Sequence, residues 1–169
     1  MGILDKRKSL VEFRLANGAV DLPHIVFLAE EAHGESRFGY IPFSAEKTRK
    51  VARRALDDPK RHGVMLAFKK DEPIGILYCS IGEYHIGTDV LLTTIHNVNV
   101  LKSVRETLAG GRAAVGLING ARSWSKARGA QEILLHVTSG VGLAGTHRFA
   151  KKMGFEFVGG SYVAAIPIC

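Results

Sequence analysis

The strongest constraint on the fold is a glycine-rich segment that lies between a strand-like and a helix-like stretch. Val90–Val100 is rich in β-branched residues, which predicts a long strand. Leu108–Ala114 (LAGGRAA) contains Gly110 and Gly111, so we expect a tight turn that opens a helix to about Arg128. The first N–H groups of a helix lack partners and its dipole favours negative charge, so this junction is a candidate anion site. A plain tight turn accounts for the same residues.

Known nucleotide motifs do not fit this junction. The segment has neither the GxxxxGK[ST] pattern of a P-loop nor the GxGxxG pattern of a dinucleotide site. It also comes late in the chain, whereas a Rossmann fold places its glycine-rich turn after the first strand. Arg112 adds a fixed cation that can grip a phosphate group.

The rest of the chain predicts an α/β domain. Expected strands are Val11–Ala16, Val64–Phe68, Pro73–Ile81, Glu132–Val137 and a closing pair, Phe155–Val158 and Ser161–Ile166, around Gly159-Gly160. Expected helices are Leu22–Ala32 with Asp21 as N-cap, Ser44–Leu56 and Thr146–Met153, and His33–Phe43 should be a loop. We therefore expect residues 1–169 to form one domain, a mixed, mostly antiparallel sheet flanked by helices on both faces, in the order β-α-α-β-β-β-α-β-α-β-β. The strands before and after the 112–128 helix should be parallel, joined by a right-handed crossover.

The net positive charge of the chain indicates an anionic partner. The 169 residues carry a formal charge of +7, and the segment from Asn99 to the C-terminus accounts for +6 of it, with nine Lys or Arg against three Glu. A basic surface suits nucleic acid, a membrane surface or a phosphorylated small molecule. Solvated helix faces would explain the same charges.

Other classes of protein are excluded by composition. Two cysteines, Cys79 and Cys169, are too few for a disulfide scaffold or a zinc site built on cysteines, and we expect no bound metal. No stretch approaches the roughly 20 apolar residues of a membrane span. Met1–Lys8 is charged and no long apolar run follows it, so we expect no signal peptide and a cytoplasmic location.

Several segments together resemble the GNAT superfamily of N-acetyltransferases. Val98–Gln131 resembles the motif in which a strand is followed by R/Q-x-x-G-x-G/A and a long helix, with Ala109–Ala114 in register. Arg148–Phe155 resembles the closing helix with its KxGF ending. Gly34–Phe43 and the GGRAA string resemble phage or prophage-type members, and the element order matches over nearly the full chain.

The resemblance implies an enzyme that transfers an acetyl group from acetyl-CoA directly to a primary amine. Backbone groups of Val98, Asn99 and Val100 would pair with the pantetheine arm. The amides of Ala109, Gly110, Gly111, Arg112, Ala113 and Ala114 would hold the pyrophosphate. The 3′-phosphate would meet a basic side chain, for which the candidates are Lys102, Arg105, Arg148 and Lys151.

Three positions depart from the family pattern. Ala109 stands at the first motif position, usually Arg or Gln, and Arg112 replaces the usual second glycine. Ala150 stands where a tyrosine often acts as general acid. A catalytically inactive CoA-binding domain therefore remains an alternative, and a basic nucleic-acid-binding module is a further one. The acceptor, whether small molecule, protein or modified base, is not identified, and a homodimer is possible because many relatives pair.

The candidate general bases are His96, Glu83 and Glu35. His96 lies two residues before Val98 in the expected strand, so their side chains should share one face. Glu83 follows the preceding strand and Glu35 lies in the expected acceptor loop. Each also fits a structural interpretation, as a packed histidine or a solvated acid. A backbone N–H near Val98 would serve as the oxyanion donor.

Substitutes for the missing tyrosine are weak. The candidate acids are Tyr162 on the expected closing strands and Ser139 after the expected strand Glu132–Val137. Water is a third source of the proton. Phe38, Tyr40 and Phe43 would either wall the acceptor cleft or anchor the loop to the core.

Overall fold

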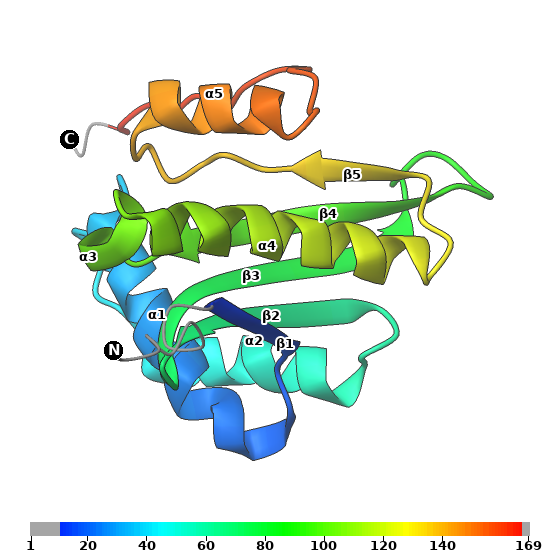
Figure 1. Ribbon diagram of the computed structural model, residues 1–169. Coiled ribbons are helices and arrows are strands. Elements are labelled where there is room, and N and C mark those ends of the chain that lie inside the picture. Colours follow the sequence, from blue (N-terminus) through cyan, green and yellow to red (C-terminus); the bar gives the residue numbers. More distant parts are fainter. Residues whose placement is uncertain (1–10, 167–169) are drawn as a thin grey trace, which may run out of the picture.

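Five strands lie side by side in the order β1-β2-β3-β4-β5, with helices on both faces of the sheet (Figure 1). The computed structural model describes residues 11–166, and the predictions for Met1–Lys8 and Cys169 concern residues outside this range. The strands are β1 Val11–Leu15, β2 His62–Lys69, β3 Glu72–Glu83, β4 Leu91–Val100 and β5 Glu132–Leu135. The helices are α1 Leu22–Glu35, α2 Ala45–Asp57, α3 Lys102–Arg105, α4 Leu108–Lys126 and α5 Leu143–Lys152. No helix in this part of the chain has the length and apolar character needed to cross a membrane.

The sheet has the mixed pairing predicted from the sequence. β1 to β4 pair antiparallel with their neighbours, and β5 pairs parallel with β4, with Leu92 opposite Glu132. A parallel pair needs a crossover connection, which α4 provides. The expected fold class, a mostly antiparallel sheet flanked by helices on both faces, is confirmed.

Each face of the sheet buries its own apolar cluster. On the α4 face, Leu77, Ile95 and Leu117 are almost completely buried. On the opposite face, α1 and α2 cover the sheet, and Leu28 and Leu66 have no exposed surface. Burying such a side chain contributes roughly 1.5–3 kcal/mol, so these two clusters hold the sheet between its helices.

The entry to α1 differs from the expected N-cap. Gly18–Asp21 forms a 3-10 turn, and the buried Asp21 carboxylate accepts hydrogen bonds from the Arg14 guanidinium and the Asn17 N–H rather than capping the helix. The Arg14 guanidinium holds the pKa of Asp21 below its ordinary value. Asp21 is the N-cap residue of α1 as expected, but its side chain does not cap the helix, because a charged partner on β1 competes with the free helix amides for the same oxygens. α1 also runs past Ala32 to Glu35.

The glycine-rich segment is helical, not a turn. α4 begins at Leu108, because the Thr107 side chain caps it by accepting a hydrogen bond from the Gly110 N–H. Gly110 lies against α3, and a Cβ there would collide with the Val104 carbonyl oxygen. Nothing lies within 4 Å of a Cβ at Gly111. The glycine therefore permits a close approach of two helices rather than a bend in the chain.

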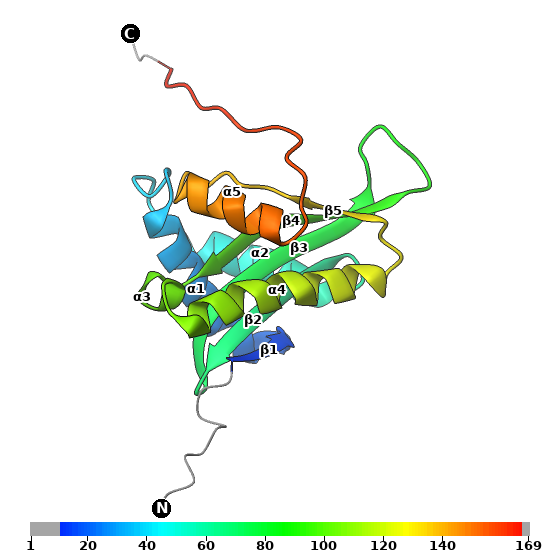
Figure 2. The ribbon, with the colours of Figure 1, turned by 45° about the horizontal axis from the view of Figure 1, so that its top comes forward.

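The predicted closing strands are absent from the described residues. β5 ends at Leu135, two residues before the expected end, and α5 starts at Leu143 rather than Thr146. After α5 the chain runs to residue 166 without a strand and leaves the body (Figure 2). The prediction of the strands was wrong because alternation gives a segment strand character, whereas a strand also needs a hydrogen-bonding neighbour.

Candidate active site at the fork between two strands

β4 and β5 separate halfway along β4 and leave a fork between them. The pairing runs from Leu92–Glu132 to Ile95–Leu135, and the His136 N–H then donates to the Ile95 carbonyl at 3.1 Å. β4 continues to Val100 on β3. Beyond Ile95, its backbone groups on the β5 side have no strand partner among the described residues.

A β-bulge stands at the apex of this fork. Tyr78 and Cys79 of β3 lie opposite Asn97 and Ile95 of β4, so His96 is an extra residue in β4. The bulge shifts the alternation of β4, and both Ile95 and Val98 pack against the cluster under α4. The prediction that His96 and Val98 share a face is therefore wrong. The His96 ring contacts Ser80 and Tyr78 on the opposite face.

Four rings from adjacent strands form a row across this face, which we call the ring row: His62, Tyr78, His96 and His136. The Tyr78 hydroxyl and His62 Nδ1 are 3.1 Å apart. The Tyr78 ring stacks on both neighbours, with centroids 6.1 Å from His62 and 5.2 Å from His96. The His136 ring meets His96 edge-on at 6.2 Å. In residues 11–166 no group of three His, Cys, Asp or Glu is arranged to hold a metal ion.

The surroundings of His96 favour its neutral form. Partial burial lowers the pKa of His96 below 6.5, and the neighbouring charges of His136 and His62 lower it further. The Ser80 hydroxyl is 2.7 Å from His96 Nε2 and fixes the orientation of the ring. Burial raises the pKa of Tyr78. His96 is thus available to accept a proton at neutral pH, and the Tyr78 hydroxyl stays protonated.

Glu35 and Arg105 meet at the far end of β4. Arg105 Nη1 lies 2.9 Å from a Glu35 carboxylate oxygen, and Arg105 Nη2 donates to the Val100 carbonyl at 2.9 Å. The Asn99 side-chain carbonyl accepts from the same Nη2 at 3.2 Å, while its buried Nδ2 has no partner. This ion pair joins α1 to α3, and the other hydrogen bonds of Arg105 join both to the end of β4. Glu35 is therefore engaged in an ion pair rather than free as a base.

The segment after β5 contacts the loop between α1 and α2. The Arg37 N–H donates to the Ser139 carbonyl at 2.6 Å, and Gly140 lies against the Arg37 side chain. The expected acceptor loop and the far side of the fork are therefore in direct contact. Tyr40 in this loop is largely exposed, so it does not anchor the loop to the core.

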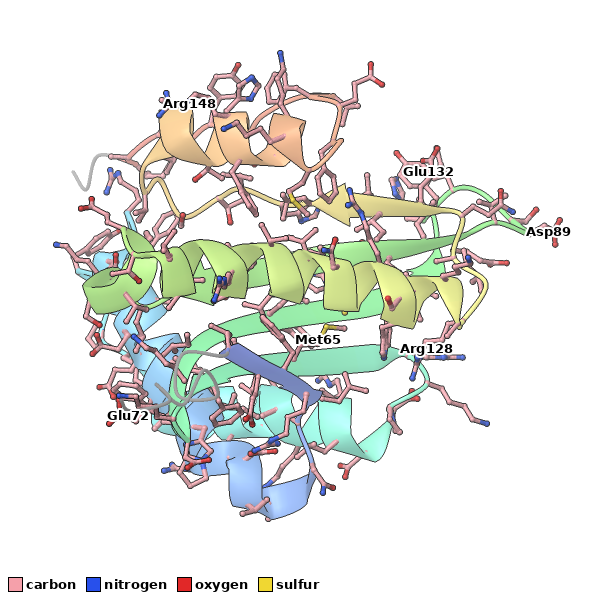
Figure 3. All side chains as sticks on the ribbon, viewed as in Figure 1. Met65, Glu72, Asp89, Arg128, Glu132 and Arg148 are labelled. Carbon is pink, nitrogen blue, oxygen red and sulfur yellow. The ribbon has the colours of Figure 1, made fainter. Side chains whose placement is uncertain are left out.

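Glu83 lies away from the fork. It pairs with Leu91 at the start of β4, and its carboxylate accepts from the Asp89 N–H at 3.1 Å. Asp89 is at the tip of the protruding β3–β4 hairpin (Figure 3). Seven residues of strand separate Leu91 from Val98, which corresponds to about 23 Å. Glu83 stabilises the hairpin, and its selection as a candidate base is corrected.

The predicted phosphate-binding residues occupy two places. The free N–H groups at the start of α4 belong to Leu108 and Ala109, because the Gly111 N–H already donates to the Thr107 carbonyl. Gly111, Arg112, Ala113 and Ala114 lie in the regular helix, so their amides are not free as expected. Arg148 and Lys151 lie on α5, where Figure 3 shows Arg148 at the periphery of the molecule.

Sequence reasoning missed His136, Ser80 and Tyr78. A usable signal existed for His136, because β4 and β5 were expected to be parallel neighbours, and parallel neighbours end at the same edge of a sheet. His96 and His136 should then have been placed together. Ser80 and Tyr78 carried no such signal, because the bulge decides which face of β4 they meet.

Comparisons with known proteins support the fold at low identity. No protein-family model matches the sequence, and no curated protein matches it either. The aminoglycoside N-acetyltransferase AAC(6')-Iy, in complex with the bisubstrate analogue CoA-S-monomethyl-acetylneamine, is 18% identical with a TM-score of 0.73, covering 95% of this chain and 100% of that one. A ribosomal-protein-alanine N-acetyltransferase from Brucella melitensis biovar Abortus 2308 is 14% identical with a TM-score of 0.66, covering 94% and 100%. Glucosamine-6-phosphate N-acetyltransferase from Arabidopsis thaliana is 11% identical with a TM-score of 0.69, covering 94% and 99%. Residues 11–166 thus have the fold of the GNAT N-acetyltransferases.

Proposed function

We propose that this protein is an acetyl-CoA-dependent N-acetyltransferase that passes the acetyl group directly to a primary amine. The observation that carries the proposal is the fork between β4 and β5 with His96 in the bulge at its apex. A neutral histidine next to unpaired strand backbone supplies a base and a row of hydrogen-bonding groups at one point.

The residues of the fork fit acetyl-CoA, which supplies the thioester carrying the acetyl group. The Leu101 N–H donates to β3, so by alternation Val98 and Val100 direct their backbone groups into the fork. Arg105 already occupies the Val100 carbonyl, which leaves the Val98 carbonyl and the Val100 N–H for the pantetheine arm. The Leu108 and Ala109 N–H groups would hold a phosphate.

His96 acts as the general base in this proposal. It removes a proton from the acceptor ammonium group, so that the amine lone pair can attack the thioester carbonyl. Ser80 is a positioning residue, because its hydroxyl is hydrogen-bonded to His96 Nε2. The Val98 N–H is the proposed oxyanion donor, since it faces the fork beside the bulge.

The proton for the departing thiolate needs a donor other than position 150. Ala150 has no proton to give, and Tyr162 is 99% exposed on the segment that leaves the body. The backbone carbonyl of Ser139 is bonded to Arg37, and its hydroxyl accepts from the Val141 N–H. We assign this role to His136, which stands across the fork from His96.

The acceptor is proposed as a primary amine of a small molecule, a protein or a modified base. AAC(6')-Iy and the Arabidopsis enzyme act, by name, on an aminoglycoside and on glucosamine 6-phosphate. The ring row consists of three histidines and one tyrosine. The negative charge of the Glu35 carboxylate is neutralised by the Arg105 guanidinium. The phage-type resemblance and the cytoplasmic location stay predictions.

Two measurements test the function. Acetyl-CoA well above its dissociation constant should raise the melting temperature by stabilising the folded state, and a 100-fold excess corresponds to about 2.7 kcal/mol. Release of free CoA with a panel of primary amines then measures transfer. A shift without turnover by any amine would favour the inactive CoA-binding domain that Ala150 suggests. No shift with acetyl-CoA, together with a salt-sensitive shift with DNA, would favour the nucleic-acid-binding alternative.

A further inference from the structure

The outer face of α2 concentrates positive charge. Five exposed cations of this helix lie within residues 47–54: Lys47, Arg49, Lys50, Arg53 and Arg54. The two acidic residues of the helix, Glu46 and Asp57, lie outside that stretch, one at each end. In residues 11–166 no ion pair joins any of the five cations to a carboxylate. The middle of α2 therefore presents charge to solvent that its own chain does not neutralise.

Three of these cations form a line along the helix, which we call the basic stripe: Lys47, Lys50 and Arg54. Their spacing of three and four residues places them on one face. Ala52 and Ala55 of the same helix are buried in the cluster against the sheet. Like charges at this spacing repel and destabilise a helix, and an anion bound alongside would remove the repulsion. The 13 residues of α2 extend over about 20 Å, so the partner that fits best is an extended anion.

The C-terminal end of α2 leads directly to the ring row. α2 packs against β2 (Figure 1), and the His62 N–H at the start of β2 donates to the Asp58 carbonyl at 2.9 Å. Burial raises the pKa of Tyr78, and the positive charge of Arg54 acts in the opposite direction, so this end of the stripe lies close to the tyrosine. The two outer histidines of the row are exposed. The stripe and the ring row thus form one continuous surface that ends at the fork.

A single strand of nucleic acid fits this surface better than an acidic protein or a membrane. Lys and Arg side chains hold phosphate backbones, and unpaired bases stack on histidine and aromatic rings. The centre of a protein interface is depleted of charge, and a helix that lies in a membrane surface needs a broad apolar face. Within α2 the only large apolar side chain that is exposed is Val51, at 43%. A duplex fits less well, because its bases are paired and stacked within the helix.

We propose that a single strand of nucleic acid binds with its phosphates along the basic stripe and its bases over the ring row, and that this strand carries the acceptor amine. The second part rests on the proposed acetyl transfer, whereas the first does not. In the transfer the amine nitrogen forms a bond to the acetyl carbon while the carbon–sulfur bond breaks. The ammonium group loses two protons: His96 releases one to solvent, and the other replaces the proton that His136 gives to the thiolate. The products are the N-acetylated strand and free CoA.

The first test is the fluorescence anisotropy of a labelled single strand of mixed sequence, DNA in one arm and RNA in the other, titrated with the full chain over a range of salt concentrations without acetyl-CoA. Lys50→Gln combined with Arg54→Gln should weaken binding at least about tenfold. It should also reduce the salt slope by about 1.4, because each phosphate contact on a single strand contributes about 0.7. The matched control, Lys69→Gln with Lys70→Gln at the β2–β3 turn, removes the same charge and should bind like wild type.

Four outcomes of this titration would overturn the proposal. They are no binding by wild type, equal binding by the stripe variant and wild type, equal losses in the stripe and control variants, and tighter binding of the duplex than of either strand. Competition then tests the class of partner. Polyglutamate at the same concentration of charge should not displace the strand, and displacement would mean that the stripe binds acidic protein instead.

The second test locates the bases. A strand containing 5-iodouracil is bound to the chain and irradiated, and the crosslinked peptides are identified by mass spectrometry. The proposal expects crosslinks at Tyr78, His96 or His136. Crosslinks confined to α5 or to the β3–β4 hairpin would contradict it. Neither binding nor crosslinking requires acetyl transfer, so both results hold whether or not the proposed function is correct.

The third test concerns the acceptor. A strand with an aminoalkyl group on one base is compared with the same aminoalkyl compound free in solution, and release of CoA is measured. The strand should be acetylated with a kcat/KM at least about tenfold higher, because the stripe supplies binding energy that the free amine lacks. Lys50→Gln with Arg54→Gln should reduce this advantage and leave turnover of the free amine unchanged. Equal kcat/KM values for both amines in wild type would overturn the acceptor assignment while the proposed acetyl transfer stands.

Discussion

The two faces of the sheet are built for different tasks. The face under α4 is an apolar, dry face, and Leu77, Ile95, Leu117 and Ile118 in it are almost completely buried. The opposite face is covered by α1 and α2 over one part, and the remainder carries the ring row. The main apolar core and the proposed catalytic residue therefore lie on opposite sides of the same strands.

The bulge at His96 makes this division possible. Without the extra residue, strict alternation would keep His96 and Val98 on one face, either both in the core or both outside. With it, β4 keeps Val98 and Val100 in the core beyond the bulge and still presents His96 to the other face. A single inserted residue thus puts a titratable group at the apex of the fork at no loss to the core.

The largest effect should come from His96→Gln, which removes the proposed base but keeps a side chain that can bond Ser80. We expect turnover of acetyl-CoA with an accepted amine to fall by about 10²- to 10⁴-fold. The melting temperature should change little. Asn97→Ala, which changes the exposed neighbouring residue, is the matched control and should keep its activity.

The pH dependence of wild-type activity also tests the role of His96. The pKa of His96 is lowered from 6.5, so this proposed base is neutral and able to accept a proton above pH 6.5. The acidic limb of kcat/KM should therefore lie below pH 6.5, and His96→Gln should abolish it. An unchanged acidic limb in the variant would assign the base to another group.

The opposite face should respond to Leu117→Ala with a loss of stability. Leu117 is 1% exposed, and truncating a buried leucine costs about 2–5 kcal/mol because a cavity remains. Urea denaturation monitored by circular dichroism measures the difference. Activity per folded molecule should be retained at low temperature. A large fall in turnover of fully folded variant would show that the two faces are not separate.

An intermediate loss of stability is expected from Asp21→Asn at the start of α1. The carboxylate is buried beside Arg14, so losing its charge should cost about 2 kcal/mol at pH 7. The folded-state pKa is depressed, so this contribution is present above the ordinary value of 3.8 and is lost as the pH falls through the folded-state pKa. Denaturation at pH 7 and at pH 3 should therefore show a smaller difference between variant and wild type at the lower pH.

The smallest effect is a gain of stability from Thr93→Val on the dry face. The Thr93 hydroxyl is buried without a hydrogen-bond partner, and an unsatisfied buried hydroxyl costs free energy. Replacing it by a methyl group of similar shape should raise the free energy of unfolding by about 1 kcal/mol. A loss of stability in the same denaturation experiment would indicate that the hydroxyl has a partner, and that this face is less dry than described.

Alternation and composition predicted most of the fold but not its irregularities. The β-branched run ending at Val100 and the apolar run from Glu132 predict two strands, and the helix between them predicts their parallel pairing, which the structure has. The bulge at His96 was not recognised, because one extra residue leaves no mark in the hydrophobic pattern. Leu108–Ala114 is helical because Thr107, which lies just before this segment, caps α4 with its side chain. The hydrogen-bond partner of a capping side chain is seen only in three dimensions.

The candidate site, like the fold, could be predicted only in part from the sequence. The position of His96 near Val98 predicts a general base at this point of the strand, although the shared face expected for the two side chains is wrong. The sequence predicts separate roles for Glu35 and Arg105, whereas the structure brings them together as an ion pair. Their contact joins residues 70 positions apart, which no local spacing can reveal.

The close packing of Gly110 against α3 has a consequence for how the start of α4 meets an anion. The direction of this helix end is set by backbone touching backbone, with no side chain whose rotamers could vary. An incoming phosphate would find its donors already ordered, so little conformational entropy is lost at that point. The two adjacent glycines therefore differ in whether they can be substituted. Position 110 admits no larger residue without moving α3, whereas position 111 has open space for one.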